Sequence, residues 1–148
     1  MSRNSFFKIF RFFLVIYVFL YRLTGGKFGG EVQGLPVLLL TTLGRKTGKT
    51  RITPLGYLEH AGAHVITATN AGFDTHPAWF HNLKSHPQVA LQVGKKQWTA
   101  TAEVAGPTLR GPLWARFVER APGYGAYEKR TSREIPIVLL RPVLEERS

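Results

Sequence analysis

The residues most suited to chemistry stand between Thr41 and Pro54, in the stretch TTLGRKTGKTRITP. Four cationic side chains alternate there with two glycines and several threonine hydroxyls. Glycine permits positive φ and a close approach of the backbone to a ligand, and successive N–H groups in such a turn form an anion-binding concavity. Guanidinium and ammonium groups bind phosphate and carboxylate strongly. The stretch therefore predicts a tight, cationic turn that binds a polyanion.

Two other interpretations of this stretch compete with that one. The pattern of a nucleotide-binding P-loop is nearly met by Gly44, Gly48 and Lys49, but one spacer residue is missing. A P-loop must also open into a helix, whereas Ile52–Pro54 is β-branched and is then interrupted by proline. The sequence therefore excludes an NTPase and leaves a solvated basic hairpin turn as the plain alternative.

The overall charge indicates the same kind of partner. The 148 residues carry a formal net charge of +11 at pH 7, which favours a polyanionic cofactor, nucleic acid or an anionic membrane surface. The absence of cysteine excludes disulfides and thiolate metal sites. The histidine spacing predicts no metal site, and the serines lack a nucleophile elbow. An enzyme built on this chain therefore needs a cofactor that carries the chemistry.

The elements that position the turn predict a mainly β, α+β domain. The apolar run 37–40 indicates a buried strand that pairs with its neighbour across the turn. Short strands linked by hairpins, with two helices between them, favour an antiparallel barrel with helices packed outside. After the second helix, residues 122–131 are expected to form a loop. The further strands are expected at 55–59, 64–69, 88–93, 97–104 and 135–140, and the helices at 77–84 and 108–120.

Residues 1–23 form a separate feature, basic and without acidic residues. Their unbroken apolar stretch, 12–21, is too short for a membrane span of ~20 residues, and no small-residue cleavage site follows it. We expect a basic amphipathic helix on an anionic membrane surface, which places the protein at the cytoplasmic side of the cell membrane. A helix buried against the domain is the alternative. Residues 24–148 are expected to form a single cofactor-binding domain.

Five short motifs occur in a fixed order along the chain: YRLTGG at 21–26, LLLTTLGRKTGKTRITPL at 38–55, HPAWFHNL at 76–83, PGY at 122–124 and REIP at 133–136. Together they resemble the deazaflavin (coenzyme F-420)-dependent nitroreductase family, which includes a branch of F-420H2-dependent quinone reductases. The resemblance covers roughly residues 17–142. It implies a split β-barrel of the flavin-mononucleotide-binding-oxidoreductase type with short packing helices, and F-420 as the cofactor.

The resemblance also implies roles for individual residues. The phosphate and acidic glutamyl tail of the coenzyme would be held by Arg45, Lys46, Thr47 and Arg51. The deazaflavin ring would be contacted by Thr53, Pro54, Leu55, Ala68, Thr69, Asn70, Pro77, Ala78 and Trp79. On the acceptor side, one phenol of the pair Tyr124 and Tyr127 would donate a hydrogen bond or a proton.

The function implied is hydride transfer from reduced F-420 to a quinone, a nitro-aromatic or a similar flat, electron-poor acceptor. A relative has aromatic residues where Ala121 and Arg130 stand here, a departure that leaves nitroimidazole reduction open. One alternative is a non-catalytic basic module that binds nucleic acid or anionic lipid, although no nucleic acid is expected. Another is the same barrel with flavin mononucleotide or heme, which the number of cations in the turn disfavours. A homodimer is left open.

Overall fold

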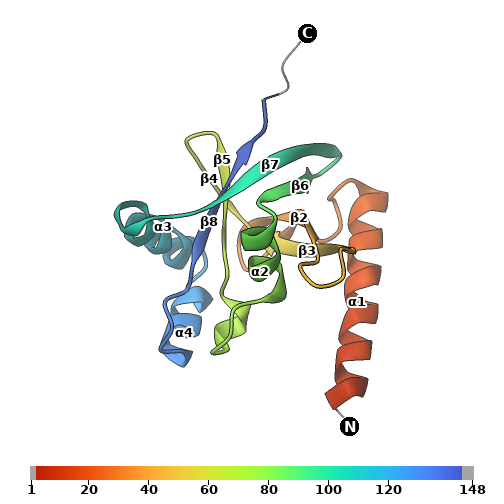
Figure 1. The fold of residues 1–148 in the computed structure, drawn as a ribbon, viewed down its shortest axis with the longest axis horizontal. Coiled ribbons are helices and arrows are strands. Elements are labelled where there is room, and N and C mark those ends of the chain that lie inside the picture. Colours follow the sequence, from red (N-terminus) through yellow and green to blue (C-terminus); the bar gives the residue numbers. More distant parts are fainter. Residues whose placement is uncertain (1–2, 145–148) are drawn as a thin grey trace.

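The computed structural model describes residues 3–144, which form a curled antiparallel sheet with helices around it (Figure 1). The described helices are α1 (Arg3–Thr24), α2 (Ala78–Ser85), α3 (Pro107–Arg120) and α4 (Gly123–Arg130), with a single 3-10 turn η1 (Asn70–Gly72). The described strands are β1 (Glu31–Val32), β2 (Leu35–Leu43), β3 (Thr50–Gly56), β4 (Leu58–His60), β5 (Ala63–Thr67), β6 (Gln88–Val93), β7 (Lys96–Val104) and β8 (Ile137–Pro142).

Four of the seven strand pairings in the described sheet are hairpins between consecutive strands: β1–β2, β2–β3, β4–β5 and β6–β7. Its order is β1-β2-β6-β7-β8-β5-β4, and β3 pairs with β2 off this path. Every pairing is antiparallel. The β2–β3 register places Leu43 opposite Thr50, so the cationic turn closes this hairpin. The mainly β architecture predicted from the sequence is confirmed.

Strand β2 is apolar at nearly every position because both of its faces are covered. Leu38 and Leu40 point into a core cluster that also contains Trp79 and Leu83 of α2. Val37 and Leu39 point the other way and pack against α1. A strand buried on both faces shows a continuous apolar run instead of alternation, which explains the sequence pattern at 37–40.

The C-terminal part of α1 is fixed to the sheet. Tyr21 is 1% exposed, and its hydroxyl donates to the Val37 carbonyl at 2.9 Å and accepts from the Gly94 N–H at 2.9 Å. The Nε of Arg22 donates to the side-chain oxygen of Gln92 at 3.0 Å. Behind the helix, Gly26 has φ +87°, and a Cβ there would stand 3.0 Å from the Gly94 Cα. Close backbone approach at this point therefore requires glycine.

The expectation of a loop at residues 122–131 is wrong, because most of this segment forms a short helix, α4. Proline is tolerated in the first turn of a helix, where its missing N–H has no intrahelical role, and Pro122 has αR dihedrals directly before α4. The Tyr124 ring stacks on Phe117 of α3 with a centroid distance of 5.7 Å, which anchors the helix. The last strand also begins later than expected, at Ile137, since Pro136 has no N–H for the sheet.

Candidate functional site

A cleft of about 1110 Å³ opens between α1, the β2–β3 hairpin, the loop around η1 and the start of α2. Four cationic side chains line it: Arg11, Arg45, Lys46 and Arg51. Among the lining residues that the structure describes there is no aspartate or glutamate. The three ion pairs found within residues 3–144 involve none of these cations. Uncompensated positive charge in a concave site attracts an anionic ligand.

The cationic turn is held by its own backbone. The Gly44 N–H donates to the Lys49 carbonyl at 2.8 Å, and the Gly48 N–H donates to the Gly44 carbonyl at 2.9 Å. Gly48 has φ +70°, the left-handed conformation that favours glycine. The Lys49 N–H donates to the Thr47 hydroxyl at 3.2 Å. The tight turn predicted from the glycine spacing is confirmed.

Helix α2 holds the cationic turn in place through hydrogen bonds of one amide side chain, Asn82. The Arg45 N–H donates to its side-chain oxygen at 3.1 Å, and its nitrogen donates to the Thr42 hydroxyl at 3.2 Å. Asn82 is 4% exposed; its bond to Thr42 is buried, and its bond to Arg45 is partly buried at the cleft lining. Sequence reasoning missed this residue, and its only signal was a polar side chain on the apolar side of a short helix.

The opposite rim of the cleft is held by a single guanidinium, that of Arg133. Its nitrogens donate to the carbonyls of Ala68, Thr69 and Phe73 at 3.1, 2.8 and 2.9 Å, and one lies 3.0 Å from Nδ1 of His76. Burial lowers the pKa of Arg133, and the Asp74 carboxylate opposes this. Burial also lowers the pKa of His76, and the charge of Arg133 lowers it further. At neutral pH the imidazole is therefore neutral, and its Nδ1 accepts a hydrogen bond from the guanidinium.

Apolar surface completes the cleft on two sides. Trp79 is 7% exposed at the start of α2, and Pro54 and Leu55 of β3 lie on the same lining. The other wall belongs to α1 and consists of Phe6, Phe10, Leu14, Val15 and Val18. A cleft that combines partly aromatic walls with cations suits a planar ring that carries a polyanionic tail.

Most of the residues expected to hold a cofactor come together in this cleft. They are Arg45, Lys46, Thr47, Arg51, Thr53, Pro54, Leu55, Thr69, Asn70, Pro77, Ala78 and Trp79. Ala68 does not line it, because its side chain is fully buried in the core and only its carbonyl contributes, as an acceptor for Arg133. The α1 residues in the lining had not been assigned from the sequence.

The two tyrosines belong to α4 and lie outside the cleft lining. Burial raises the pKa of Tyr124 to about 12, and its ring lies 5.6 Å from that of Tyr127. The hydroxyl of Tyr127 accepts a hydrogen bond from the side chain of Gln33 at 3.0 Å. A Cβ at Gly56 would stand 3.3 Å from the Tyr124 hydroxyl, so this phenol lies against β3 at Gly56, the residue after Leu55 and outside the cleft lining.

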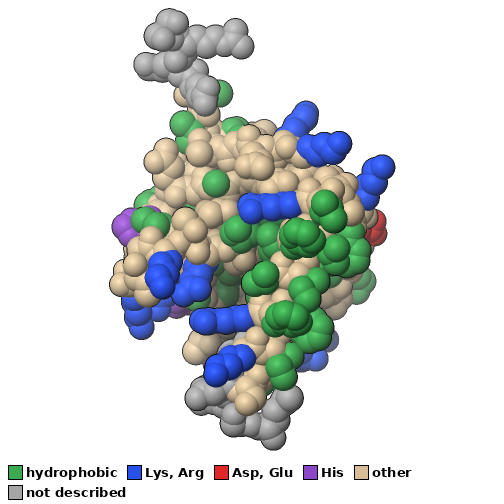
Figure 2. All heavy atoms as spheres, turned by 90° about the vertical axis from the view of Figure 1, so that its right-hand side faces the viewer, with side chains coloured by type: hydrophobic (Ala, Val, Ile, Leu, Met, Phe, Trp, Pro, Cys, Tyr) green, Lys and Arg blue, Asp and Glu red, His purple; other side chains and the backbone are tan. Residues whose placement is uncertain are grey.

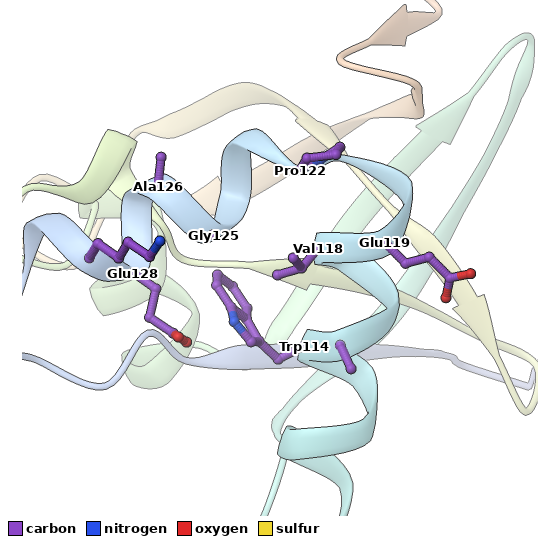
Figure 3. Close-up of a pocket in the computed structure, with 9 residues that line it drawn as sticks. Trp114, Val118, Glu119, Pro122, Gly125, Ala126 and Glu128 are labelled. Carbon is purple, nitrogen blue, oxygen red and sulfur yellow. The ribbon is translucent and has the colours of Figure 1, made fainter.

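A second hollow, of about 790 Å³, lies between α3 and α4 (Figure 3). Figure 3 shows the Trp114 side chain projecting from α3 toward α4, and Glu119 and Glu128 also belong to the lining. Among its described lining residues, Glu119 and Glu128 oppose an anionic ligand, and Lys129 is the one cation that balances them. The cationic cleft is therefore the better candidate for a polyanionic cofactor.

A curled antiparallel barrel with a cationic, partly aromatic cleft on its open side defines a class of protein, the split-barrel oxidoreductases that bind a flavin-like coenzyme. The chain belongs to the F-420H(2)-dependent quinone reductase family, whose sequence model matches residues 14–142. An F-420H(2)-dependent quinone reductase of Mycobacterium tuberculosis is 39% identical over 127 residues, which cover 82% of this chain and 84% of the relative.

Solved structures agree with this assignment. The chain resembles an F-420-H2 dependent reductase, FDR-A, with 36% identity and a TM-score of 0.66 over 72% of this chain and 94% of that one. It also resembles a protein described as a domain-swapped dimer, with 30% identity and a TM-score of 0.67 over 95% and 100% of the two chains. The split barrel, the oxidoreductase class and coenzyme F-420 as cofactor, expected from the sequence, are confirmed.

Proposed function

We propose that the chain reduces a quinone with coenzyme F-420H2 bound in the cationic cleft. One observation carries this proposal: the same cleft holds four cations and a largely apolar wall formed by Trp79, Pro54 and Leu55. Among the described residues that line the cleft, none is acidic. When bound, the reduced deazaflavin supplies the hydride. The protein binds the coenzyme and the acceptor, excludes water from them and supplies a proton or hydrogen bond to the reduced acceptor oxygen.

The cations and the turn serve to hold the coenzyme's anionic part. Arg45, Lys46 and Arg51, with the Thr47 hydroxyl, provide charged and neutral donors for phosphate and carboxylate oxygens. At the other end, Thr69 and Asn70 offer a hydroxyl and an amide to the ring carbonyls. The ring would lie against the remaining lining residues expected to contact it, Thr53, Pro54, Leu55, Pro77, Ala78 and Trp79.

A tyrosine phenol is the proposed donor to the acceptor. Its support is the proximity of the Tyr124 hydroxyl to Gly56, the residue after Leu55 of the cleft. Because burial raises the pKa of Tyr124 to about 12, this phenol keeps its proton at neutral pH. A protonated phenol can stabilise negative charge that develops on a quinone oxygen. Tyr127, 5.6 Å away between ring centroids, is the second candidate.

The test compares cofactors and acceptors on the purified full chain. Binding of oxidised F-420 and of flavin mononucleotide is measured by fluorescence titration, and oxidation of reduced F-420 is followed with a soluble quinone or a nitro-aromatic. We expect tighter binding of F-420 than of flavin mononucleotide, and turnover with the quinone. Preference for flavin mononucleotide, or oxidation no faster with quinone than without it, would contradict the proposal.

We further propose that α1 rests on an anionic membrane surface at the cytoplasmic side through its outer face, defined as Ile9, Phe12, Phe13, Ile16, Phe19 and Leu23. These side chains are 38–69% exposed, and Figure 2 shows hydrophobic side chains in a band along this side of the molecule with Lys and Arg beside it. An exposed apolar face with neighbouring cations suits the interface of an anionic bilayer. No helix in the described part of the chain is long and apolar enough to cross a membrane.

Vesicle sedimentation tests this second proposal. A double substitution on the outer face, Phe12→Asp with Phe19→Asp, is expected to abolish binding to phosphatidylcholine vesicles that contain phosphatidylglycerol. Val104→Asp, at an exposed apolar position on β7, is the matched control and should bind as the parent does. The membrane proposal would be contradicted if the parent does not bind vesicles. If the parent is then a dimer in solution and the double variant a monomer, the outer face contacts a second copy of the chain instead.

A further inference from the structure

One side of α1 forms a wall of the cofactor cleft. The α1 residues in the lining are Phe6, Phe10, Arg11, Leu14, Val15 and Val18. Phe6, Phe10, Leu14 and Val18 follow each other at intervals of four residues, and Arg11 and Val15, also four apart, form the adjacent row, so all six lie on one side of the helix. The outer face lies on the other side, so α1 carries two apolar faces with different surroundings. The inner one belongs to the same concave surface as the cationic turn.

Arg11 is the cation on this inner side. Arg22, in the last turn of the helix, is already bonded to Gln92, and Lys8 does not belong to the cleft lining. Arg11 lines the cleft together with Arg45, Lys46 and Arg51, and within residues 3–144 no acid is paired with any of them. Four like charges in one cleft repel each other, so the arrangement is stabilised when a multivalent anion occupies it.

We infer that Arg11 is a further binding residue for the anionic tail of the cofactor, and that the tail runs between α1 and the β2–β3 turn. The inference rests on the proposed function, with F-420 in this cleft. The shared ligand chemistry is an anionic oxygen, of phosphate or of glutamyl carboxylate, held by a guanidinium. It follows that α1 contributes to cofactor affinity and is a functional part of the site.

The experiment compares Arg11→Ala and Arg11→Glu with the matched control Lys8→Ala, all as full chains. Lys8→Ala removes one charge from the same helix without touching the cleft lining. Fluorescence titrations use F-420, a deazaflavin that keeps the phosphate but lacks the glutamates, and a deazaflavin that lacks both. Thermal melts of each variant establish that it is folded before it is titrated.

We expect Arg11→Ala to weaken F-420 binding roughly 10- to 100-fold, the loss of one charge-assisted contact, and Arg11→Glu to weaken it more. Lys8→Ala should change it by less than about 3-fold. The deazaflavin without phosphate and glutamates should bind all variants alike. If affinity for the deazaflavin that keeps only the phosphate also falls, Arg11 binds the phosphate. If only the affinity for F-420 falls, Arg11 binds the glutamyl carboxylates. Both results support the inference.

Three results would overturn it in distinguishable ways. If the parent chain does not bind F-420, the proposed function itself fails. If the parent binds F-420 and Arg11→Ala behaves as Lys8→Ala does, only the role of Arg11 fails. If Arg11→Ala also loses affinity for the probe without phosphate and glutamates, Arg11 acts on the ring or on the fold, and its assignment to the tail is wrong.

Discussion

Removing the guanidinium of Arg133 should open the rim of the cofactor cleft. This one side chain bonds to the carbonyls of Ala68, Thr69 and Phe73 and to the imidazole of His76. The segment it holds contains Thr69 and Phe73, which line the cleft. In Arg133→Ala, three carbonyls lose a charged donor at once, and the loop retains fewer contacts to keep it in place.

The magnitude follows from these contacts. A hydrogen bond to a charged group contributes about 1.5–3 kcal/mol, but the loop is partly exposed and water replaces some of what is lost. We therefore expect the free energy of opening the segment 68–76 to fall by roughly 2–4 kcal/mol, less than the sum of four contacts. Its amide hydrogens should exchange about 30- to 1000-fold faster. Affinity for F-420 should fall roughly 10-fold, because the open loop does not bind.

Hydrogen-exchange mass spectrometry and F-420 titration measure the two effects. Arg141→Ala is the control, because Arg141 forms an exposed ion pair with Glu103 at 2.8 Å and such pairs contribute about 0–1 kcal/mol. Arg133→Lys keeps one charge but cannot bond to all four acceptors, so it should lie between the parent and the alanine variant. Unchanged exchange at 68–76 in Arg133→Ala would refute the reasoning, whatever happens to affinity.

Three further predictions concern the same cleft and the fold around it. Arg45→Ala should weaken F-420 binding by about 1–3 kcal/mol in fluorescence titration, and unchanged affinity would remove the turn from the site. Tyr124→Phe or Tyr127→Phe should slow steady-state quinone reduction roughly 100-fold, with F-420 affinity unchanged; if neither does, the proton comes from another group. Burial lowers the pKa of His64 and His76 from 6.5, so below that pH the unfolded chain binds more protons. The free energy of unfolding, measured in urea, should therefore fall as the pH falls from 6.5 toward their folded-state values; no pH dependence in this window would contradict the assignment.

The parts of the site that could be predicted from the sequence are local ones. The glycines and cations of the β2–β3 turn lie within a few residues of each other, and turn geometry depends on short-range backbone preferences. The apolar run 37–40 predicted a buried strand because it, too, is a short-range pattern. The motif order added Trp79 and its neighbours in α2, and the structure brings them to the same cleft as the turn.

The rest depended on contacts between distant residues. Arg133 lies about 60 residues from each of its acceptors, and no local pattern distinguishes it from the other arginines. Proline and glycines at the start of α4 favoured a loop, but stacking of Tyr124 on Phe117 outweighed their low helix propensity. The composition of α1 shows that it is apolar, but only the packing of β2 and β3 shows which of its two sides faces the cleft.

The attachment of α1 also sets an order of events during synthesis. The Tyr21 hydroxyl needs the Val37 carbonyl, 16 residues later, and the Gly94 N–H, 73 residues later. Chains emerge from the ribosome N-terminus first, at about 5–20 residues per second. For several seconds the α1 segment has therefore been synthesised while the Gly94 N–H that helps to hold it has not yet been made. During that interval both of its apolar sides are open to a nascent-chain chaperone or to the membrane surface.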